Sequence, residues 1–464
     1  MSSNHATPQN VIWITTDHMR YDCVGAHGNS AMHTPNLDRL VNGGISFDRC
    51  YANNPVCMPS RASFMTGCYP QQTGVVNNGL ELDGNFPSTV ARVLKTGGYQ
   101  ARQIGKLHFQ NHEDHDLDPR ARHAYGFDSF ELSEEPGCYE DAYRTWLRGA
   151  HPDLVETFTL ARPKSFERRA ERTEYRVLDA PWTASHSGWI AQQFENKYAS
   201  WGLRRGRQFY HLGFYAPHPP LNPTREMFAP YADIELPPLA RRPGDPRDPR
   251  DLDDNTLLSY RRHFYAMVTG VDMAVGRILE ALENTGELEN TLVIFGSDHG
   301  DALGDHGRTG KGPSFLESII RMPLVLHWPA GFGTTARRVA GMVEMVDIMP
   351  TLAELCGIPR HRYFAGRSYA QELLSGAPVE GRSDVYAFHG EGSLMLRTEM
   401  RKYLCYYEDG GRREELYDLE ADPDEFQNIA TDAARSAELQ RLRDRAFERT
   451  LEATKTLKER THQF

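Results

Sequence analysis

Two aspartate–histidine pairs are the residues of this sequence whose types and spacing suggest chemistry most directly. Asp17-His18 and Asp298-His299 each closely follow a short apolar segment that is typical of a buried strand. Ligands of open α/β sheets gather beyond the carboxyl ends of parallel strands. The two pairs can therefore meet, although 281 residues (298 − 17) separate them. Two carboxylates and two imidazoles are a reasonable shell for a divalent metal ion. For either pair alone, the alternative is an aspartate that caps a helix or turn.

Further basic side chains lie at the ends of predicted strands or next to prolines or glycines in the sequence. Lys106 and His108 follow a predicted strand, prolines flank His218, and glycines surround Lys311. Prolines stiffen a loop, and glycines let the backbone approach a ligand closely. Each side chain alone has an ordinary alternative, namely a solvated strand end, a packed turn histidine or a solvated lysine. Together they can face the site of the two pairs.

The run Cys57-Met58-Pro59-Ser60-Arg61 adds a cysteine just before a predicted helix. Taken alone, it is compatible with a free, buried thiol at a loop broken by proline, because short motifs have a real false-positive rate. A helix over 60–65, directly after Cys57, would point its positive end toward an anion.

Alternating strands and helices must position these residues. The alternation predicts an α/β fold with a large, mainly parallel sheet flanked by helices. The predicted strands are 11–15, 99–104, 209–215 and 292–295, and the predicted helices begin near 34 and 60 or cover 89–96 and 260–282.

The pattern changes after about residue 375. Four short strands (384–388, 393–398, 402–407 and 415–419) and a charged helix over 432–457 predict a smaller C-terminal antiparallel sheet plus helix. We therefore divide the chain into 1–375, a catalytic domain, and 376–464, a C-terminal subdomain. The charged insertion at about 110–185 is expected to cover a site or a subunit contact, and 236–255 is expected to be a surface loop.

Composition limits the possible partners and compartments. The formal net charge of -11 disfavours nucleic acid as a partner, because phosphate binding needs a basic surface. No apolar run approaches the roughly 20 residues that span a bilayer, so we expect no membrane partner. The polar first ten residues do not resemble a signal peptide. The seven cysteines are odd in number and form no C-x-x-C pair. Free thiols in a reducing cytoplasm explain this best.

Together these segments resemble the type I sulfatases of the alkaline phosphatase superfamily. The resemblance covers residues from about 10 to 430, in the family's order. In that family, the cysteine of Cys-x-Pro-x-Arg is oxidised to the aldehyde formylglycine. The matching segments are 16–22, 57–61 with 66–67, 105–108, 217–220, 298–300, 304–307, 311–312, 402–403, 415–419 and 422–423.

The resemblance implies a role for each candidate residue. The metal ligands would be Asp17, His18, Asp298, His299 and the modified Cys57, with Ca²⁺ as the ion that the family uses. Arg61 would orient the aldehyde hydrate, and Asn78 would touch the transferring group. Lys106, His108, His218 and Lys311 would surround the sulfate and the leaving oxygen.

The implied reaction is hydrolysis of a sulfate monoester. One hydroxyl of the hydrated aldehyde attacks sulfur, fixed cations neutralise the equatorial oxygens, and His218 or Lys311 protonates the leaving oxygen. The second hydroxyl then expels sulfate and restores the aldehyde. The implied partners are a small anionic sulfate ester and a formylglycine-generating or equivalent maturation enzyme. A homo-oligomer is compatible with the charged insertion and the C-terminal tail.

One residue departs from the family pattern. Most sulfatases carry a second aspartate where this chain has His18. An imidazole should weaken the preference for Ca²⁺, which favours oxygen, and makes Mn²⁺ plausible. The related phosphonate monoester hydrolases also depart from aspartate here, but they generally lack the Lys and His found at 106 and 108.

Two alternatives to the sulfatase reading stay open. One is a phosphonate monoester or phosphodiester hydrolase on the same scaffold, and the other is a sulfatase-like binding protein whose Cys57 stays unmodified. The physiological substrate also stays open among aryl sulfates, sulfated sugars, choline sulfate and phosphonate esters.

Overall fold

The structure is a computed structural model that describes residues 7–110, 125–136, 140–159, 175–201, 206–242, 252–390, 392–408 and 410–455. Parts of the predicted insertion at 110–185 and of the predicted loop at 236–255 lie outside the described residues. Within the described residues, no helix combines the length and the apolar character needed to cross a bilayer.

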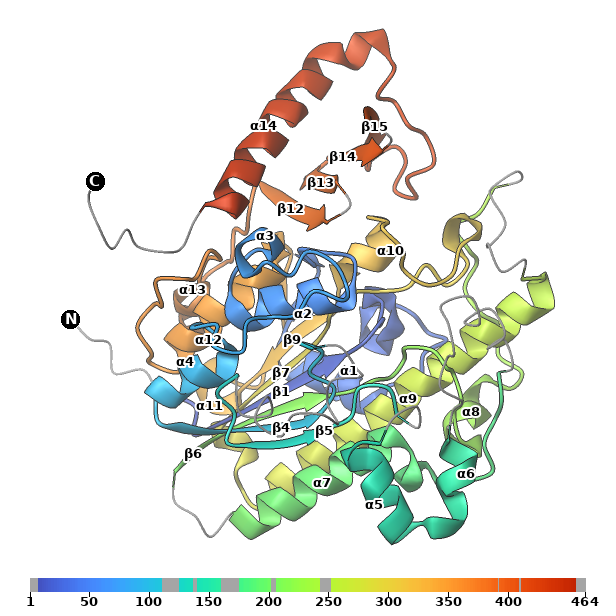
Figure 1. Ribbon diagram of the computed structural model, residues 1–464, viewed down its shortest axis with the longest axis vertical. Coiled ribbons are helices and arrows are strands. Elements are labelled where there is room, and N and C mark those ends of the chain that lie inside the picture. The colour runs from blue at the N-terminus through green and yellow to red at the C-terminus, as the bar shows by residue number, and fades with distance from the viewer. Residues whose placement is uncertain are drawn as a thin grey trace.

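An eight-stranded sheet forms the centre of the molecule (Figure 1), in the order β10-β2-β9-β7-β1-β6-β4-β5. All its strand pairs are parallel except those that β9 makes with β2 and β7. The strands are β1 Asn10–Thr16, β2 Ile45–Phe47, β4 Tyr99–Gly105, β5 Ser129–Leu132, β6 Arg207–Gly213, β7 Thr291–Ser297, β9 Leu324–His327 and β10 Arg337–Val339. This confirms the predicted large, mainly parallel sheet.

Helices cover both faces of this sheet, as Figure 1 shows. Successive side chains of β1 point to opposite faces. Val11 and Trp13 pack with α2, α4 and α12, whereas Ile12 and Ile14 pack with α1, α7 and α9. A central strand that is buried on both faces reads as a continuous apolar run, which is why β1 was predictable. The helices are α1 Pro35–Gly43, α2 Cys57–Thr66, α4 Val90–Thr96, α7 His186–Trp201, α9 Asp254–Asn284 and α12 Ile348–Leu355.

Two predicted boundaries were wrong near the candidate site. Helix α2 begins at Cys57 itself, not after it, because Pro59 lies in the first turn, where a missing N–H costs nothing. Strand β6 ends at Gly213 instead of residue 215. The predicted helix over 260–282 is the middle of the longer α9, which Asp253 caps by accepting a hydrogen bond from the Thr256 N–H.

The C-terminal region forms the predicted smaller antiparallel sheet with a helix. Its strands are β12 Asp384–His389, β13 Ser393–Thr398, β14 Arg401–Glu408 and β15 Gly411–Asp418, and α14 Ser436–Thr454 packs against them (Figure 1). The division at 375/376 stays a prediction.

A three-stranded sheet that was not predicted lies beside the central one, in the order β11-β3-β8. Its strands are β3 Cys50–Tyr51, β8 Arg321–Met322 and β11 Val343–Glu344. The remaining short helices are α3 Pro70–Thr73, α5 Ala142–Ala150, α6 Val155–Phe158, α8 Arg225–Phe228, α10 Glu317–Ile320, α11 Pro329–Phe332 and α13 Ala370–Ser375.

Candidate active site

The two predicted Asp-His pairs meet at one edge of the central sheet. Thr16 of β1 lies opposite Ser297 of β7 in the parallel register, so both pairs begin at the same level. The backbone N–H of His18 donates to Asp298 Oδ1 over 3.2 Å. The carboxyl ends of neighbouring parallel strands therefore build the site, as the sequence predicted.

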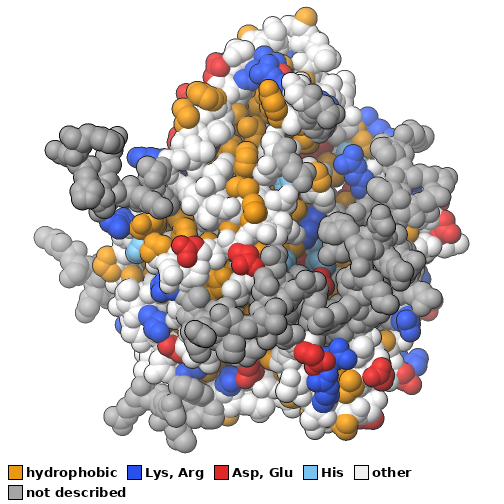
Figure 2. Space-filling view, viewed as in Figure 1, with side chains coloured by type: hydrophobic (Ala, Val, Ile, Leu, Met, Phe, Trp, Pro, Cys, Tyr) orange, Lys and Arg blue, Asp and Glu red, His pale blue; other side chains and the backbone are white. Residues whose placement is uncertain are grey.

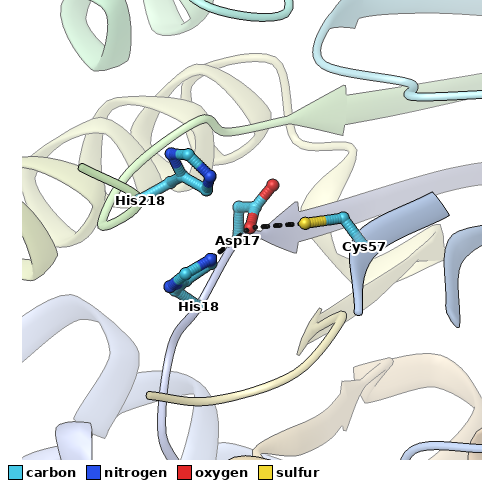
Figure 3. A group of neighbouring side chains, drawn as sticks. All are labelled: Asp17, His18, Cys57 and His218. Atoms are coloured by element: carbon cyan, nitrogen blue, oxygen red, sulfur yellow. Dashed lines mark hydrogen bonds and ion pairs between the residues drawn. The ribbon is translucent and has the colours of Figure 1, made fainter. Parts of the chain in front are cut away.

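Helix α2 delivers Cys57 to the same place (Figure 3). Its Sγ lies 3.5 Å from Asp17 Oδ1 and 3.2 Å from His299 Nε2. Burial, and then the charge of Asp17, raise the pKa of the Cys57 thiol to about 12. At neutral pH this thiol is protonated, so the encoded cysteine is a poor nucleophile by itself.

Two overlapping groups of side chains can hold a metal ion. Their ligand atoms lie within 4.8 Å of one another, and both groups contain Asp17 and Cys57. Asp298 and His299 complete the first group, whereas His18 and His218 complete the second. The His18 Nε2 is buried and has no hydrogen-bond partner among the described residues. A donor set of carboxylates and imidazoles with an unused, buried ring nitrogen fits a divalent metal ion.

All three imidazoles present the same nitrogen to this centre. The Nδ1–H of His18 donates to Asp301 Oδ2 (3.1 Å), that of His299 to the Gly300 carbonyl (2.9 Å) and that of His218 to the Pro219 carbonyl (2.6 Å). Such contacts fix the tautomer and leave Nε2 free to bind a metal. Burial lowers the pKa of His299 to about 4 and lowers the pKa values of His18 and His218 as well, so all three rings are neutral at pH 7.

Basic side chains surround the carboxylates. The Lys106 Nζ lies 2.8 Å from Asp17 Oδ2, and the Arg61 Nε donates to Asp298 Oδ2 over 2.8 Å. Burial alone would raise the pKa of Asp17, but Lys106 and other nearby cations hold it well below its usual value. The Lys311 Nζ contacts Cys57 Sγ and lies 3.0 Å from His299 Nε2. Figure 2 shows a few histidine and basic side chains near the centre of the face in view. The arrangement suits an anionic ligand.

A pair of glycines lets Lys106 reach this edge. Gly105 has a φ of +85°, and a Cβ there would lie 2.1 Å from the Gly213 carbonyl oxygen. A Cβ at Gly213 would lie 1.8 Å from the Lys106 carbonyl oxygen. Only glycine fits at both positions, so the ends of β4 and β6 approach closely and the Lys106 N–H donates to Gly213 O over 2.7 Å.

Asn78 and His108 lie at the margin of the site. The Asn78 Oδ1 accepts a hydrogen bond from the Met58 N–H (3.0 Å), so it supports the first turn of α2 beside Cys57. His108 follows the Lys106 turn with a φ of +57°, and its N–H donates to Glu134 Oε1 over 2.8 Å. Neither side chain belongs to the two metal-capable groups.

Sequence reasoning missed two supporting carboxylates. Asp301 binds His18 and also accepts hydrogen bonds from the Tyr260 hydroxyl (2.8 Å) and from the Gly310 N–H (2.9 Å), next to Lys311. Its position three residues after Asp298 was a usable signal. Glu134 comes from the insertion, where the sequence carries no periodic pattern, and nothing pointed to it.

Comparisons with known proteins agree with this geometry. The family model for sulfatases matches residues 9–358, and the model for the C-terminal part of N-sulphoglucosamine sulphohydrolase matches residues 304–452. An arylsulfatase of Clostridium perfringens (strain 13 / Type A) is 29% identical over 458 residues, which cover 90% of each chain.

Solved structures show the same fold. The crystal structure of the phosphonate monoester hydrolase of Agrobacterium radiobacter has a TM-score of 0.81 and 25% identity, covering 96% of each chain. A structure of a protein in complex with its substrate D-glucosamine-2-N,6-O-disulfate has a TM-score of 0.73 and 21% identity, covering 96% of this chain and 98% of the other. The sulfatase family model matches most of the length of this chain. The chain therefore belongs to the sulfatase family of the alkaline phosphatase superfamily.

Proposed function

We propose that this enzyme hydrolyses a sulfate monoester through formylglycine made from Cys57, with the help of one divalent metal ion. The observation that carries the proposal is the place of Cys57. It begins α2 at the sheet edge, and its Sγ contacts Asp17, His299 and Lys311. A residue there can attack an ester that the surrounding cations hold.

The metal ion would be held by Asp17, His18, Asp298 and His299 together with residue 57. Bound there, the ion supplies Lewis acidity to the reacting oxygens. Family membership supports Ca²⁺, whereas the nitrogen donor of His18 supports Mn²⁺. As a hydrated aldehyde, residue 57 supplies two hydroxyls on one carbon, one for attack on sulfur and one for release of sulfate.

The side chains of the chain itself bind and orient the ester. Lys106 and Lys311 neutralise the negative charge on the sulfate oxygens, and Arg61 holds Asp298 in place. Helix α2 begins at Cys57, so the positive end of its dipole lies beside the same anion. His218 or Lys311 delivers the proton that the leaving oxygen needs.

A mass measurement on the natively produced enzyme tests the proposal. The mass of the peptide that carries Cys57 should fall, because oxidation to the aldehyde replaces sulfur with oxygen and removes hydrogen. Sulfenic or sulfinic forms would be heavier instead. An unmodified thiol in an active preparation would contradict the mechanism, and an unmodified thiol in an inactive preparation would favour a binding protein whose Cys57 is never oxidised.

A phosphonate monoester or phosphodiester hydrolase is the second candidate. It is supported by the likeness to the phosphonate monoester hydrolase of Agrobacterium radiobacter and by the absence of aspartate at position 18. Matched aryl sulfate and aryl phosphonate esters separate the two candidates by their kcat/KM values. We expect the sulfate to be preferred, and a large preference for the phosphonate would reverse the ranking.

The proposal also covers the compartment in which the enzyme works and its assembly. We infer that the enzyme works in the cytoplasm, where a maturation enzyme oxidises Cys57, and that copies of the chain associate. All six cysteines in the described residues are free, which supports a reducing compartment.

A further inference from the structure

We propose that the chain, while Cys57 is still a thiol, binds Zn²⁺ through Asp17, His18, Cys57 and His218 (Figure 3). This site shares Asp17, His18 and Cys57 with the proposed site for the ion of the sulfatase reaction, but His218 takes the place of Asp298 and His299. Zinc binding by the thiol form needs neither oxidation of Cys57 nor turnover of an ester, so its failure and the failure of the proposed function are distinguishable.

The spacing of the four ligand atoms suits zinc. With bonds of about 2.0–2.3 Å, neighbouring ligand atoms of a tetrahedral zinc site lie roughly 3.3–3.8 Å apart. The His18 Nε2 lies 3.7 Å from Asp17 Oδ1, and the Cys57 Sγ lies 3.5 Å from the same oxygen. Two edges of the tetrahedron therefore already have the required length, and all four atoms lie within 4.8 Å of one another.

Both imidazoles are prepared as zinc ligands. His18 donates its Nδ1–H to the carboxylate of Asp301, and His218 donates its Nδ1–H to the Pro219 carbonyl. Zinc-binding histidines in proteins have partners of this kind, which aim Nε2 at the metal. The His18 ring is only 4% exposed, and its Nε2 has no hydrogen-bond partner among the described residues. Figure 3 shows the rings of His18 and His218 on the same side of Asp17.

The ligand atoms of the other group are engaged in the thiol form. Asp298 accepts hydrogen bonds from Arg61 and from the N–H groups of His18 and His299. The Lys311 ammonium lies 3.0 Å from His299 Nε2, so it donates toward the nitrogen that would bind a metal in this group; it also contacts Cys57 Sγ, which both groups share. On the His18–His218 side, the Nε2 of His18 accepts no hydrogen bond from a cation within the described residues. The donors on this side, one sulfur, two nitrogens and one oxygen, also suit zinc better than two carboxylates do.

The binding step balances without any redox partner. The Cys57 thiol gives up its proton to solvent, and the thiolate, the carboxylate of Asp17 and two neutral imidazoles bind the ion. The net charge of the ion with its ligands is then zero. A bound ion also covers Sγ, so zinc should protect this thiol from alkylation.

The test uses the full-length thiol form, made without the maturation enzyme and checked by the mass of the Cys57 peptide. Titration with Co²⁺ should give a thiolate-to-cobalt charge-transfer band that saturates at one equivalent, and Zn²⁺ should abolish the band. In His218→Ala, calorimetry should show the Zn²⁺ affinity falling by roughly 100-fold or more.

Matched variants distinguish the two groups. His108→Ala removes an imidazole outside both groups and should keep the Zn²⁺ affinity within about threefold. Asp298→Asn removes a ligand atom of the other group and a contact to the His18 N–H, so it should lower the affinity less than His218→Ala does. An unchanged affinity in His218→Ala, or an equal loss in Asp298→Asn, would overturn the proposal. If a variant does not fold, anomalous diffraction from zinc-soaked crystals of the unsubstituted thiol form decides. A peak bonded to Nε2 of His18 and of His218 supports the proposal, and a peak bonded to His299 overturns it. Neither outcome depends on turnover by the matured enzyme.

Discussion

Two regions bury charged side chains but satisfy these charges differently. One is the edge of the central sheet that carries the candidate site. The other is the joint, which is the contact of Arg449 of α14 with Glu344 and Asp384. At the joint, Glu344 accepts hydrogen bonds from Arg449 (2.6 Å), from the Tyr69 hydroxyl (2.6 Å) and from the Tyr386 N–H (2.7 Å). The other end of Arg449 binds Asp384. Opposite charges are matched on both sides of this joint, which ties the last helix to β11 of the three-stranded sheet and to β12 of the C-terminal sheet.

At the sheet edge the matching is incomplete. The cations of Arg61, Lys106 and Lys311 gather around the carboxylates of Asp17 and Asp298, and the buried Nε2 of His18 has no hydrogen-bond partner among the described residues. Unmatched groups of this kind cost stability unless a ligand completes them. The comparison teaches that the joint serves stability and the sheet edge serves binding, so substitutions in the two regions should have different readouts.

The largest effect is expected at Cys57. Cys57→Ser should keep the fold but lower kcat for an aryl sulfate by roughly 10³-fold or more, since it removes the proposed nucleophile and the proposed route to sulfate release. Steady-state kinetics and circular dichroism on the same preparation measure both quantities. Normal multiple turnover in this variant would show that a substitution at the sheet edge does not affect activity. The two regions would then no longer differ in their readouts.

Arg449→Ala should lower stability instead of activity, the opposite of Cys57→Ser. It leaves the buried Glu344 with only the more distant Arg382 (3.6 Å) and takes a cation from Asp384, which should cost about 3 kcal/mol of the free energy of unfolding. Urea denaturation measures this cost, and activity per folded molecule should be retained. Arg445→Ala on the same helix is the matched control, because its more exposed pair with Asp384 should be worth about 1 kcal/mol or less. Equal losses of unfolding free energy in the two variants would show that the buried ion pair contributes no more to stability than the more exposed one.

Lys311→Ala should lower kcat/KM by roughly 10²–10³-fold, because it removes a cation that faces the transferring group. Its melting temperature should stay close to that of the parent, since the residue is on a loop and contributes little to the core. The neighbouring, exposed Arg308→Ala controls for changes in the loop itself. A collapse in melting temperature with activity per folded molecule intact would make Lys311 a structural residue, like those of the joint.

Asp301→Asn should have a smaller effect. The amide keeps one oxygen for the Leu303 and Gly310 N–H groups, but its other end no longer accepts the His18 Nδ1–H. Metal affinity measured by calorimetry should fall by roughly 10–100-fold. In a His18→Asp background the same substitution should matter less, and fully additive losses would argue against a role through His18.

The smallest effect concerns pH at the contact between α10 and the C-terminal sheet. Burial would raise the pKa of Glu317, but Lys402, 3.0 Å away, and Arg397 lower it to about 2 from its ordinary value of 4.5. A lowered pKa contributes stability that is present above pH 4.5 and is lost as the pH falls toward 2. The free energy of unfolding should therefore fall less steeply over this range in Glu317→Gln than in the parent. Identical slopes would show that this pair is not linked to folding.

The central fold and most of the site were predictable because their signals are local. β1 and β7 are continuous apolar runs that end directly before Asp17 and Asp298, and the parallel-sheet rule then brings these residues together. The antiparallel placement of β9 and the sheet of β3, β8 and β11 were not predictable. The latter strands have two residues each, too few to show a period.

The supporting contacts also escaped prediction, since they depend on tertiary placement. The start of α2 at Cys57 follows from Pro59 in its first turn, and the bond between His18 and Asp301 follows from the bend after β7. The sequence predicted that His218 faces the site, but its meeting with His18 as part of a second donor group required coordinates.

The burial of Cys57 bears on the order in which the protein is made. The thiol is 1% exposed in the folded chain, and part of its cover comes from Asp298, His299 and Lys311. These residues leave the ribosome at least 241 residues later (298 − 57). At 5–20 residues per second this delay is on the order of 10–50 s. A maturation enzyme of the proposed kind would therefore have a window during translation in which the thiol is accessible, and this window would close when β7 pairs with β1.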